Sequence, residues 1–344
     1  MRKQAKSKPK KIFLFSDGTG NSSAALAKSN VWRMYEALDK SKPDQIAIYD
    51  NGVGTSSFRP LMLIGGAFGV GLKQNVLELY EFLCRHYNEG DKVYIIGFSR
   101  GAFTMRLVAA LVGSQGIIRV GFEDGQVKPE DLGHYSRLAY QRLTEAFPHR
   151  GNYIIGGLRN LRSAYSHLKA KALGLRPYEE IERCCQKTNV PVSPLAGGKE
   201  SLKEDNTQRS AEITFMGLFD TVSAYGGPVK ELTTAFSWLF WPSEPTDWFI
   251  GPYVKKVCHA LALDDPRQSF RPKLISEAKP EPWTDPSKEP ELEKGNRIEQ
   301  VWFSGAHSNI GGGYPNDGLS MIPLNWMIEQ LRKPKHNVRF SAEK

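Results

Sequence analysis

The chain has 344 residues, of which 40% are hydrophobic and 24% are charged, and its formal net charge is +9. A chain of this length and composition can bury one large α/β core with an insertion, or two domains. It contains no apolar run of about 18 residues, which argues against a membrane-spanning helix.

The N-terminal segment is strongly basic. Residues 1–11 contain six Lys or Arg side chains and no acidic one. We interpret residues 1–10 as a solvated, disordered tail, and a weak contact with anionic membrane or nucleic acid is the alternative. The folded part shows no nucleic-acid-binding motif or basic stripe, so we expect no nucleic-acid partner. The segment does not read as a signal peptide. We therefore expect synthesis in the cytoplasm, and leave open export without a cleaved signal or a peripheral position at membranes.

Short apolar runs that read as strands alternate with helical patterns in the first part of the chain. The strand candidates are residues 11–16, 45–50, 92–96, 212–219 and 300–305, and helical spacing occurs at 30–38 and 75–87. This alternation indicates a mostly parallel sheet with right-handed crossovers. In such sheets, functional sites gather beyond the carboxyl ends of the strands.

Residues 115–210 interrupt the alternation with helical patterns, among them YEEIERCC at 178–185, and end in a polar segment. We predict that this stretch is a helical cap with a linker, inserted into one α/β core. The two parts of that core would be residues 11–114 and 211–344.

Residues 97–102 read GFSRGA and directly follow the strand candidate at 92–96. Apolar residues then recur at helical spacing until Gly113, which we expect to end the helix. A G-x-S-x-G sequence between a strand and a helix is typical of a serine nucleophile on a sharp turn, here Ser99. Glycines at 97 and 101 would keep that strained turn free of side chains. The alternative is an ordinary strand–helix loop.

A serine nucleophile needs a base, and a carboxylate that orients the base. Of the seven histidines, His307 follows a strand candidate and precedes a run of three glycines. Asp220 directly follows the strand candidate at 212–219. The chain order Ser99, Asp220, His307 is the order of an α/β-hydrolase. Alternatively, His307 is a turn histidine and Asp220 caps the segment after it.

A rival acid–base pair lies in VCHALALDDPRQSF, where His259 and Asp264 are candidates. A helical CHALAL would place His259 and Leu263 on one face. In that case His259 is either a buried, hydrogen-bonded histidine or a residue that lines the site.

The oxyanion formed during acyl transfer needs two hydrogen-bond donors. One would be the backbone N–H of Arg100, the residue after the nucleophile. The second would come from SDGTGN after the first strand, where Gly18 and Thr19 offer backbone N–H groups. Asp17 either pins this loop by bonding backbone or faces the site. This chemistry requires no metal or other cofactor, and the sequence shows no metal-ligand cluster.

Residues 236–249 hold six Phe or Trp side chains. This segment either packs against the core or forms an interfacial patch for peripheral membrane contact.

Five motifs together carry a family resemblance: FSDGTGN, GFSRGAFTMR, GLFDTVSAYG, HALALDD and VWFSGAHSNIGGGYP. In this order they resemble the α/β-hydrolase domain of type VI secretion phospholipase effectors, from residue 11 to about residue 326. The resemblance implies an α/β-hydrolase fold, a phospholipase A activity with a Ser-Asp-His triad, and Ser99 as nucleophile. An immunity protein is a further partner that it suggests. Two residues depart from the family pattern. The family usually has a bulky residue at the position of Ser16 and an Asp at the position of Asn309.

The sequence thus predicts a serine hydrolase that cleaves carboxylic esters, foremost glycerophospholipid acyl esters, through an acyl-enzyme. A soluble esterase acting on smaller esters is one alternative. A catalytically silent binding module with the same pocket is the other.

Overall fold

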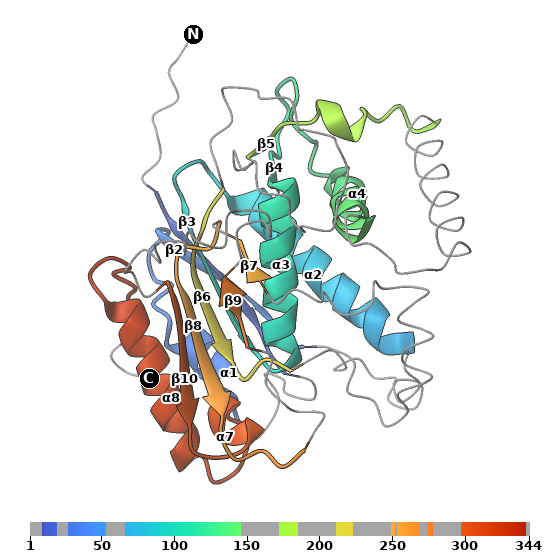
Figure 1. Cartoon of the computed structure of the whole chain (residues 1–344). Helices are drawn as coiled ribbons and strands as arrows, with labels where there is room; N and C mark the ends of the chain where they lie inside the picture. The colour runs from blue at the N-terminus through green and yellow to red at the C-terminus, as the bar shows by residue number, and fades with distance from the viewer. Residues whose placement is uncertain are drawn as a thin grey trace, which may run out of the picture.

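The computed structural model describes residues 9–18, 27–52, 66–145, 172–184, 211–222, 249–251, 253–267, 274–277 and 297–341. These residues fold around a six-stranded sheet in which every neighbouring pair of strands is parallel (Figure 1). The strand order is β10-β8-β6-β3-β1-β2. The strands are β1 (Lys11–Ser16), β2 (Gln45–Asp50), β3 (Lys92–Phe98), β6 (Ile213–Phe219), β8 (Val257–Ala262) and β10 (Ile298–Phe303).

Helices cover both faces of the sheet (Figure 1). The described helices are α1 (Asn30–Ala37), α2 (Gly66–His86), α3 (Arg100–Gln115), α4 (Leu132–Glu145), α7 (His307–Gly311) and α8 (Gly318–Arg332). Helices α2 and α3 pack on one face with α4 against them, and α1 and α8 pack on the other. Two short pairs of strands lie outside this sheet, β4 (Ile117–Ile118) with β5 (Arg183–Cys184) and β7 (Phe249–Ile250) with β9 (Ser276–Glu277).

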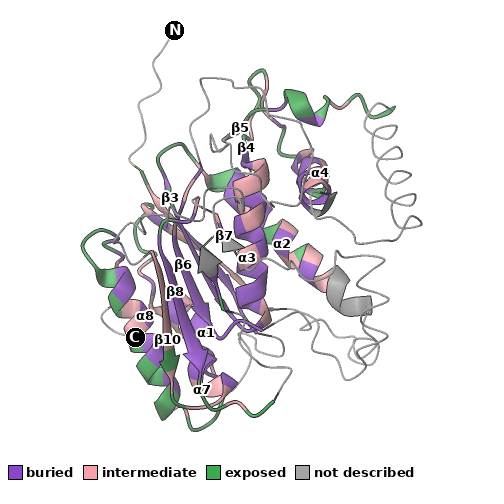
Figure 2. Cartoon of the chain, in the orientation of Figure 1, coloured by how far each residue is buried: buried purple, intermediate pink, exposed green. Residues whose placement is uncertain are grey.

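The central strands are apolar on both faces because both faces are covered. Along β1, Ile12 and Leu14 join the cluster formed with α2 and α3, whereas Phe13 and Phe15 join the cluster formed with α1 and α8. All four side chains are at most 1% exposed. Figure 2 shows this pattern, with buried strands at the centre and exposed residues on the outer sides of the helices.

The strand order places a topological switch point between β1 and β3. From β1 the chain moves to β2 on one side, and β3, β6, β8 and β10 then follow on the other side. Ligand sites of open α/β sheets lie at the carboxyl ends of the strands at such a point. The loops after β1 and β3, which begin at Asp17 and Ser99, therefore meet there. The parallel sheet with helices on both faces is an α/β-hydrolase-like fold.

Strand β8 was not among the predicted strands, and the helical interpretation of CHALAL was wrong. Residues 257–262 are a strand, buried along its whole length between β6 and β10. A continuous apolar run fits a central parallel strand as well as a buried helix, because neither shows alternation. The strand ends at Ala262, so Leu263 is 61% exposed while His259 is fully buried.

Other helix predictions also differ from the structure. Helix α2 begins at Gly66, nine residues before the predicted helical pattern at 75–87. Helix α3 continues through Gly113 to Gln115 and ends at Gly116, whose φ is 75°. At Gly113 a Cβ would lie 2.3 Å from the ring of Tyr253, so that glycine lets the Tyr253 ring pack closely against α3. YEEIERCC does not form a helix over its described part, which is a 3₁₀ turn at Tyr178–Glu180 followed by β5.

Much of the predicted cap lies outside the described residues. Its described helix, α4, packs against α2 and α3 and shares their apolar cluster. Residues 1–8 of the predicted tail and most of the aromatic segment 236–249 also lie outside the described residues. The division into core, cap and tail stays a prediction.

Candidate active site

Ser99 lies between the end of β3 and the start of α3 with backbone angles of φ 57° and ψ −122°. A non-glycine residue rarely adopts this conformation, which costs on the order of 1–3 kcal/mol and occurs mainly at functional sites. Two hydrogen bonds hold the turn: Ser99 N donates to Phe219 O at 3.0 Å, and Phe103 N donates to Ser99 O at 3.3 Å. The predicted strand–turn–helix context of Ser99 is confirmed.

The two glycines that flank Ser99 are required by close backbone contacts. A Cβ on Gly97 would lie 2.6 Å from the carbonyl oxygen of Gly101. A Cβ on Gly101 would lie 2.0 Å from the carbonyl oxygen of Ser16, at the end of the neighbouring strand β1. These contacts join the turn at Ser99 to the loop after β1.

Ser99, His307 and Asp220 form a continuous chain of hydrogen bonds. His307 Nε2 lies 2.7 Å from Ser99 Oγ, and His307 Nδ1 lies 2.6 Å from Asp220 Oδ2. Ser99 and His307 are 7% and 5% exposed, and Asp220 is fully buried. The three residues follow β3, β6 and β10, and the parallel sheet brings them together at one edge. In this arrangement the imidazole can accept the serine proton while the carboxylate orients it.

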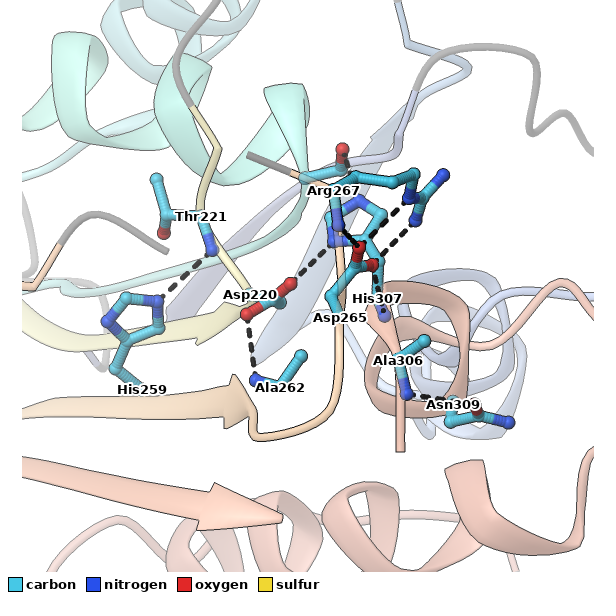
Figure 3. A network of polar contacts seen from close by, with 10 residues as sticks. Asp220, Thr221, His259, Ala262, Asp265, Arg267, Ala306, His307 and Asn309 are labelled. Atoms are coloured by element: carbon cyan, nitrogen blue, oxygen red, sulfur yellow. Dashed lines mark hydrogen bonds and ion pairs between the residues drawn. The ribbon is translucent and has the colours of Figure 1, made fainter. Parts of the chain in front are cut away.

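Asp220 is held in an uncommon backbone conformation, with φ of 40°. Its N–H donates to Ala260 O at 2.7 Å, and its Oδ1 accepts the N–H of Ala262 at 2.8 Å (Figure 3). Both partners belong to β8. One carboxylate oxygen is therefore fixed by the sheet and the other faces the imidazole.

The imidazole of His307 is held by its surroundings as well. Its ring packs against Phe98, with ring centroids 4.7 Å apart. A Cβ on Gly311 would lie 2.0 Å from the Phe98 ring, so that glycine makes room for this packing. Asn309, which departs from the family pattern, accepts the N–H of Ala306 at 3.0 Å and thereby caps the start of α7 (Figure 3).

The rival pair, His259 and Asp264, does not form an acid–base dyad in the structure. His259 is fully buried on β8 and accepts the N–H of Thr221 at 3.2 Å through Nε2. Asp264 instead accepts the N–H of Gly305 at 2.6 Å. Burial, and then the charge of Arg106, lower the pKa of His259 to about 3. A histidine with so low a pKa stays neutral and is a weak base at neutral pH.

Asp17 pins the loop after β1 through its side chain. It is 1% exposed. Its Oδ1 accepts the N–H of Gly18 at 2.7 Å, and its Oδ2 accepts the hydroxyls of Ser29 and of Tyr49, the latter at 2.6 Å. The backbone-bonding alternative of the sequence analysis therefore describes Asp17.

The same loop contains the expected second oxyanion donor. The Gly18 N–H donates to the Asp17 carboxylate at 2.7 Å. The role of Gly18 as an oxyanion donor stays a prediction. Thr19 lies outside the described residues. Arg100 opens α3, where the first N–H groups point out of the helix N-terminus, so its backbone N–H remains the candidate donor.

Helix α3 carries two guanidinium groups, those of Arg100 and Arg106. Burial lowers the pKa of Arg100 to about 10 and that of Arg106 to about 9. Both groups therefore remain charged at neutral pH, and the charge of Arg106 lies near His259.

Sequence reasoning missed four residues whose side chains hydrogen-bond to Asp17, His307 or His259: Ser29, Tyr49, Asp265 and Gln300. Ser29 N-caps α1 through a hydrogen bond from Trp32 N at 3.1 Å while it donates to Asp17. A Ser followed by the helical pattern at residue 30 is an N-cap signal that could have found it. The other three lie on strands or loops whose partners only the sheet order reveals.

Comparison with solved structures gives distant similarities. An uncharacterized protein from Pseudomonas aeruginosa is 15% identical with a TM-score of 0.43, over 97% of this chain and 47% of that chain. The esterase Est2 from the planctomycete Thermogutta terrifontis is 14% identical with a TM-score of 0.38, over 99% of this chain and 88% of that chain. This chain thus spans about half the length of the Pseudomonas protein.

Two sequence comparisons also give matches. The uncharacterized protein YEL023C of Saccharomyces cerevisiae is 34% identical over 62 residues, which are 18% of this chain and 9% of the yeast protein. The family model for the catalytic domain of Tle1-like phospholipase effectors of the type VI secretion system matches residues 10–330. That match includes the loop after β1, the turn at Ser99, Asp220, β8 and His307. The chain therefore belongs to the family of Tle1-like phospholipase effector catalytic domains.

Proposed function

We propose that this protein hydrolyses the acyl esters of glycerophospholipids, with Ser99 as nucleophile, His307 as base and Asp220 as the carboxylate that orients the base. The observation that carries the proposal is the hydrogen-bond chain from Ser99 Oγ through both nitrogens of His307 to Asp220 Oδ2. Family membership supports an ester hydrolase with lipid substrates.

In the first half of the reaction, Ser99 Oγ attacks the ester carbonyl carbon and His307 Nε2 takes the hydroxyl proton. The Arg100 N–H donates to the oxyanion of the tetrahedral intermediate. When this intermediate collapses, His307 returns the proton to the departing lysophospholipid oxygen. The acyl group remains on Ser99 as an ester.

In the second half, a water molecule attacks the acyl-enzyme. His307 Nε2 takes a proton from that water, and the new oxyanion uses the same donor. Collapse releases the fatty acid, and the proton returns to Ser99 Oγ. Throughout both halves, Asp220 accepts the Nδ1–H of His307 and stabilises the imidazolium that forms.

No helix in the described residues is long and apolar enough to cross a membrane. A phospholipase must still reach lipids, and we propose peripheral contact with the bilayer as its mode of access. Delivery by a type VI secretion system and neutralisation by an immunity protein are further proposals that follow from the family.

The test is hydrolysis of phosphatidylethanolamine and phosphatidylglycerol vesicles, with a short soluble ester assayed in parallel. We expect free fatty acid and lysophospholipid from the parent protein. Ser99→Ala should lose activity by roughly 10⁴-fold or more, as for other triad residues. Cleavage of the short ester alone would identify an esterase for smaller esters. Release of diacylglycerol or phosphatidate, or no turnover of either substrate, would contradict the proposal.

A further inference from the structure

Strand β8 carries none of the three proposed catalytic residues, yet it lies between β6, which ends just before Asp220, and β10, which leads to His307. The motif HALALDD, at 259–265, spans most of β8 and the loop after it. We propose that this segment positions both catalytic partners of the serine: His259 fixes the backbone at the acid, and Asp265 fixes the backbone of the base. The inference rests on the function proposed above.

On the acid side, three groups of β8 hold two consecutive residues. Asp220 N donates to Ala260 O, and Ala262 N donates to Asp220 Oδ1, at 2.7 and 2.8 Å. Thr221 N donates to His259 Nε2 at 3.2 Å (Figure 3). Because φ of Asp220 is 40°, this backbone needs outside support to stay in place. His259 gives the only one of these three contacts that depends on side-chain identity on β8.

The Thr221 contact also defines the protonation of His259. A backbone N–H can only donate, so Nε2 must be unprotonated and the ring proton lies on Nδ1. Nδ1 lies 3.3 Å from Gln300 Oε1, and the Gln300 amide exchanges two hydrogen bonds of 2.9 Å with the backbone of Ile275. Burial and the charge of Arg106 lower the pKa of His259 to about 3, which preserves the neutral acceptor.

On the base side, the loop after β8 holds the loop before α7. His307 N donates to Asp265 Oδ2 at 3.0 Å (Figure 3). The Asp265 side chain is 2% exposed and pairs with Arg267, whose Nε and Nη2 donate to its two oxygens at 2.9 and 2.6 Å. Asp264 and Gly305 exchange two more hydrogen bonds, of 3.1 and 2.6 Å, between the same two loops.

These contacts bear on catalysis because the hydrogen bonds of His307 span the two loops. A shift of either loop relative to the other changes the distance from His307 to Asp220 or to Ser99. A misplacement of about 1 Å can cost about 10²-fold in rate. The segment is thus a positioning element that acts through the backbones of Asp220, Thr221 and His307.

The acid side is tested with His259→Leu and His259→Gln. Leucine fills the space without an acceptor, whereas the glutamine oxygen can replace Nε2 as acceptor for Thr221. We expect His259→Leu to lower kcat about 10- to 100-fold with little change in KM, and His259→Gln to restore most of kcat. The matched control is His336→Leu, a buried histidine that packs against Tyr94 and Phe215, which should leave kcat unchanged.

The base side is tested with Asp265→Ala against Asp265→Asn, which retains one acceptor oxygen for His307 N. Alanine should lower kcat about 10-fold or more, and asparagine less. The matched control is Asp91→Ala. Asp91 is also a buried carboxylate that pairs with a cation, Lys10, and accepts backbone N–H groups, but it directly precedes β3 at the opposite end of the sheet.

A spectroscopic readout separates positioning from general stability. The low-field proton resonance of the His307–Asp220 hydrogen bond should shift or broaden in His259→Leu and Asp265→Ala, and should not change in either control. If both variants keep kcat and this resonance while only their melting temperature falls, the segment is structural and the inference is wrong. If His259→Leu does not fold, His259→Gln is compared with His259→Asn, whose shorter side chain cannot reach Thr221. Equal kcat values in these two variants would overturn the acid-side claim. Activity that survives Ser99→Ala would instead contradict the proposed function itself.

Discussion

At the scale of single residues, hydrogen-bond geometry distinguishes the two histidines that the sequence offered as rival bases, His307 and His259. His307 faces a serine hydroxyl on one nitrogen and a carboxylate on the other. His259 faces a backbone N–H and a glutamine. Only the first arrangement allows a proton to pass from the serine to a ring whose charge is then stabilised.

This difference leads to a prediction for the triad. We expect His307→Ala to lower kcat/KM for phospholipid about as severely as Ser99→Ala, by roughly 10⁴-fold or more. Asp220→Asn should approach that loss because an amide favours the wrong imidazole tautomer. His259→Leu should be milder. Steady-state assays on vesicles check this order, and a severe His259→Leu beside a mild His307→Ala would reverse the assignment.

Asp17 gives a second prediction at this scale. Its carboxylate receives the Gly18 N–H and two hydroxyls in a nearly fully buried position. Asp17→Ala would leave these donors unmatched, at a cost of about 1–3 kcal/mol for each that finds no new partner. We expect the free energy of unfolding to fall by several kcal/mol and kcat to fall with it, whereas Asp17→Asn should lose less of both. Chemical denaturation and vesicle assays measure the two effects, and an unchanged unfolding free energy in Asp17→Ala would show that this carboxylate does not pin the loop.

At the scale of elements, the turn at Ser99 and the loop after β1 behave as one unit because Gly101 brings them into contact. A Cβ at this position would lie 2.0 Å from Ser16 O. We expect Gly101→Ala to lower both the melting temperature and kcat, the latter by about 10²-fold, since the two loops must move apart. The control is Gly133→Ala in α4, where the nearest atoms lie 3.5 Å from the new Cβ. Alanine should be tolerated there. Normal kcat in Gly101→Ala would contradict the coupling.

The same elements show what the sequence could reveal. The turn at Ser99 was predictable because strand, G-x-S-x-G and helix are consecutive in the chain. Asp220 and His307 were candidates because each lies just after a strand candidate, and the structure brings their side chains within hydrogen-bond distance. Strand β8 was not, since a buried central strand lacks the alternation that separates strand from helix. The hydrogen bonds of Asp17 with Tyr49 and of Asp265 with His307 join segments far apart in the chain, which no local pattern encodes.

At the scale of the whole molecule, two buried histidines link stability to pH. Burial is the first cause that lowers the pKa of His336 to about 4, and four nearby lysines, 335, 92, 256 and 333, lower it further. Burial likewise lowers the pKa of His259 to about 3. The ordinary histidine pKa is about 6.5. Below that pH the unfolded chain binds protons that the folded protein does not, so stability is full above about 6.5 and falls as the pH drops toward 4.

We therefore expect the unfolding free energy to fall as the pH is lowered through this window, by up to about 1.4 kcal/mol per pH unit for each histidine. The melting temperature should fall with it. His336→Phe, which retains an aromatic ring beside Tyr94 and Phe215, should reduce this slope. Calorimetry across the window measures it. An unchanged slope in His336→Phe would show that this histidine does not contribute.

The central claim is that Ser99 forms a covalent adduct during turnover because His307 activates it. The most direct measurement is peptide mass spectrometry after reaction with a fluorophosphonate probe. We expect one adduct, on the peptide that contains Ser99, formed rapidly in the parent protein and much more slowly in His307→Ala. An adduct on another residue, or equal labelling rates in the parent and His307→Ala, would contradict the account.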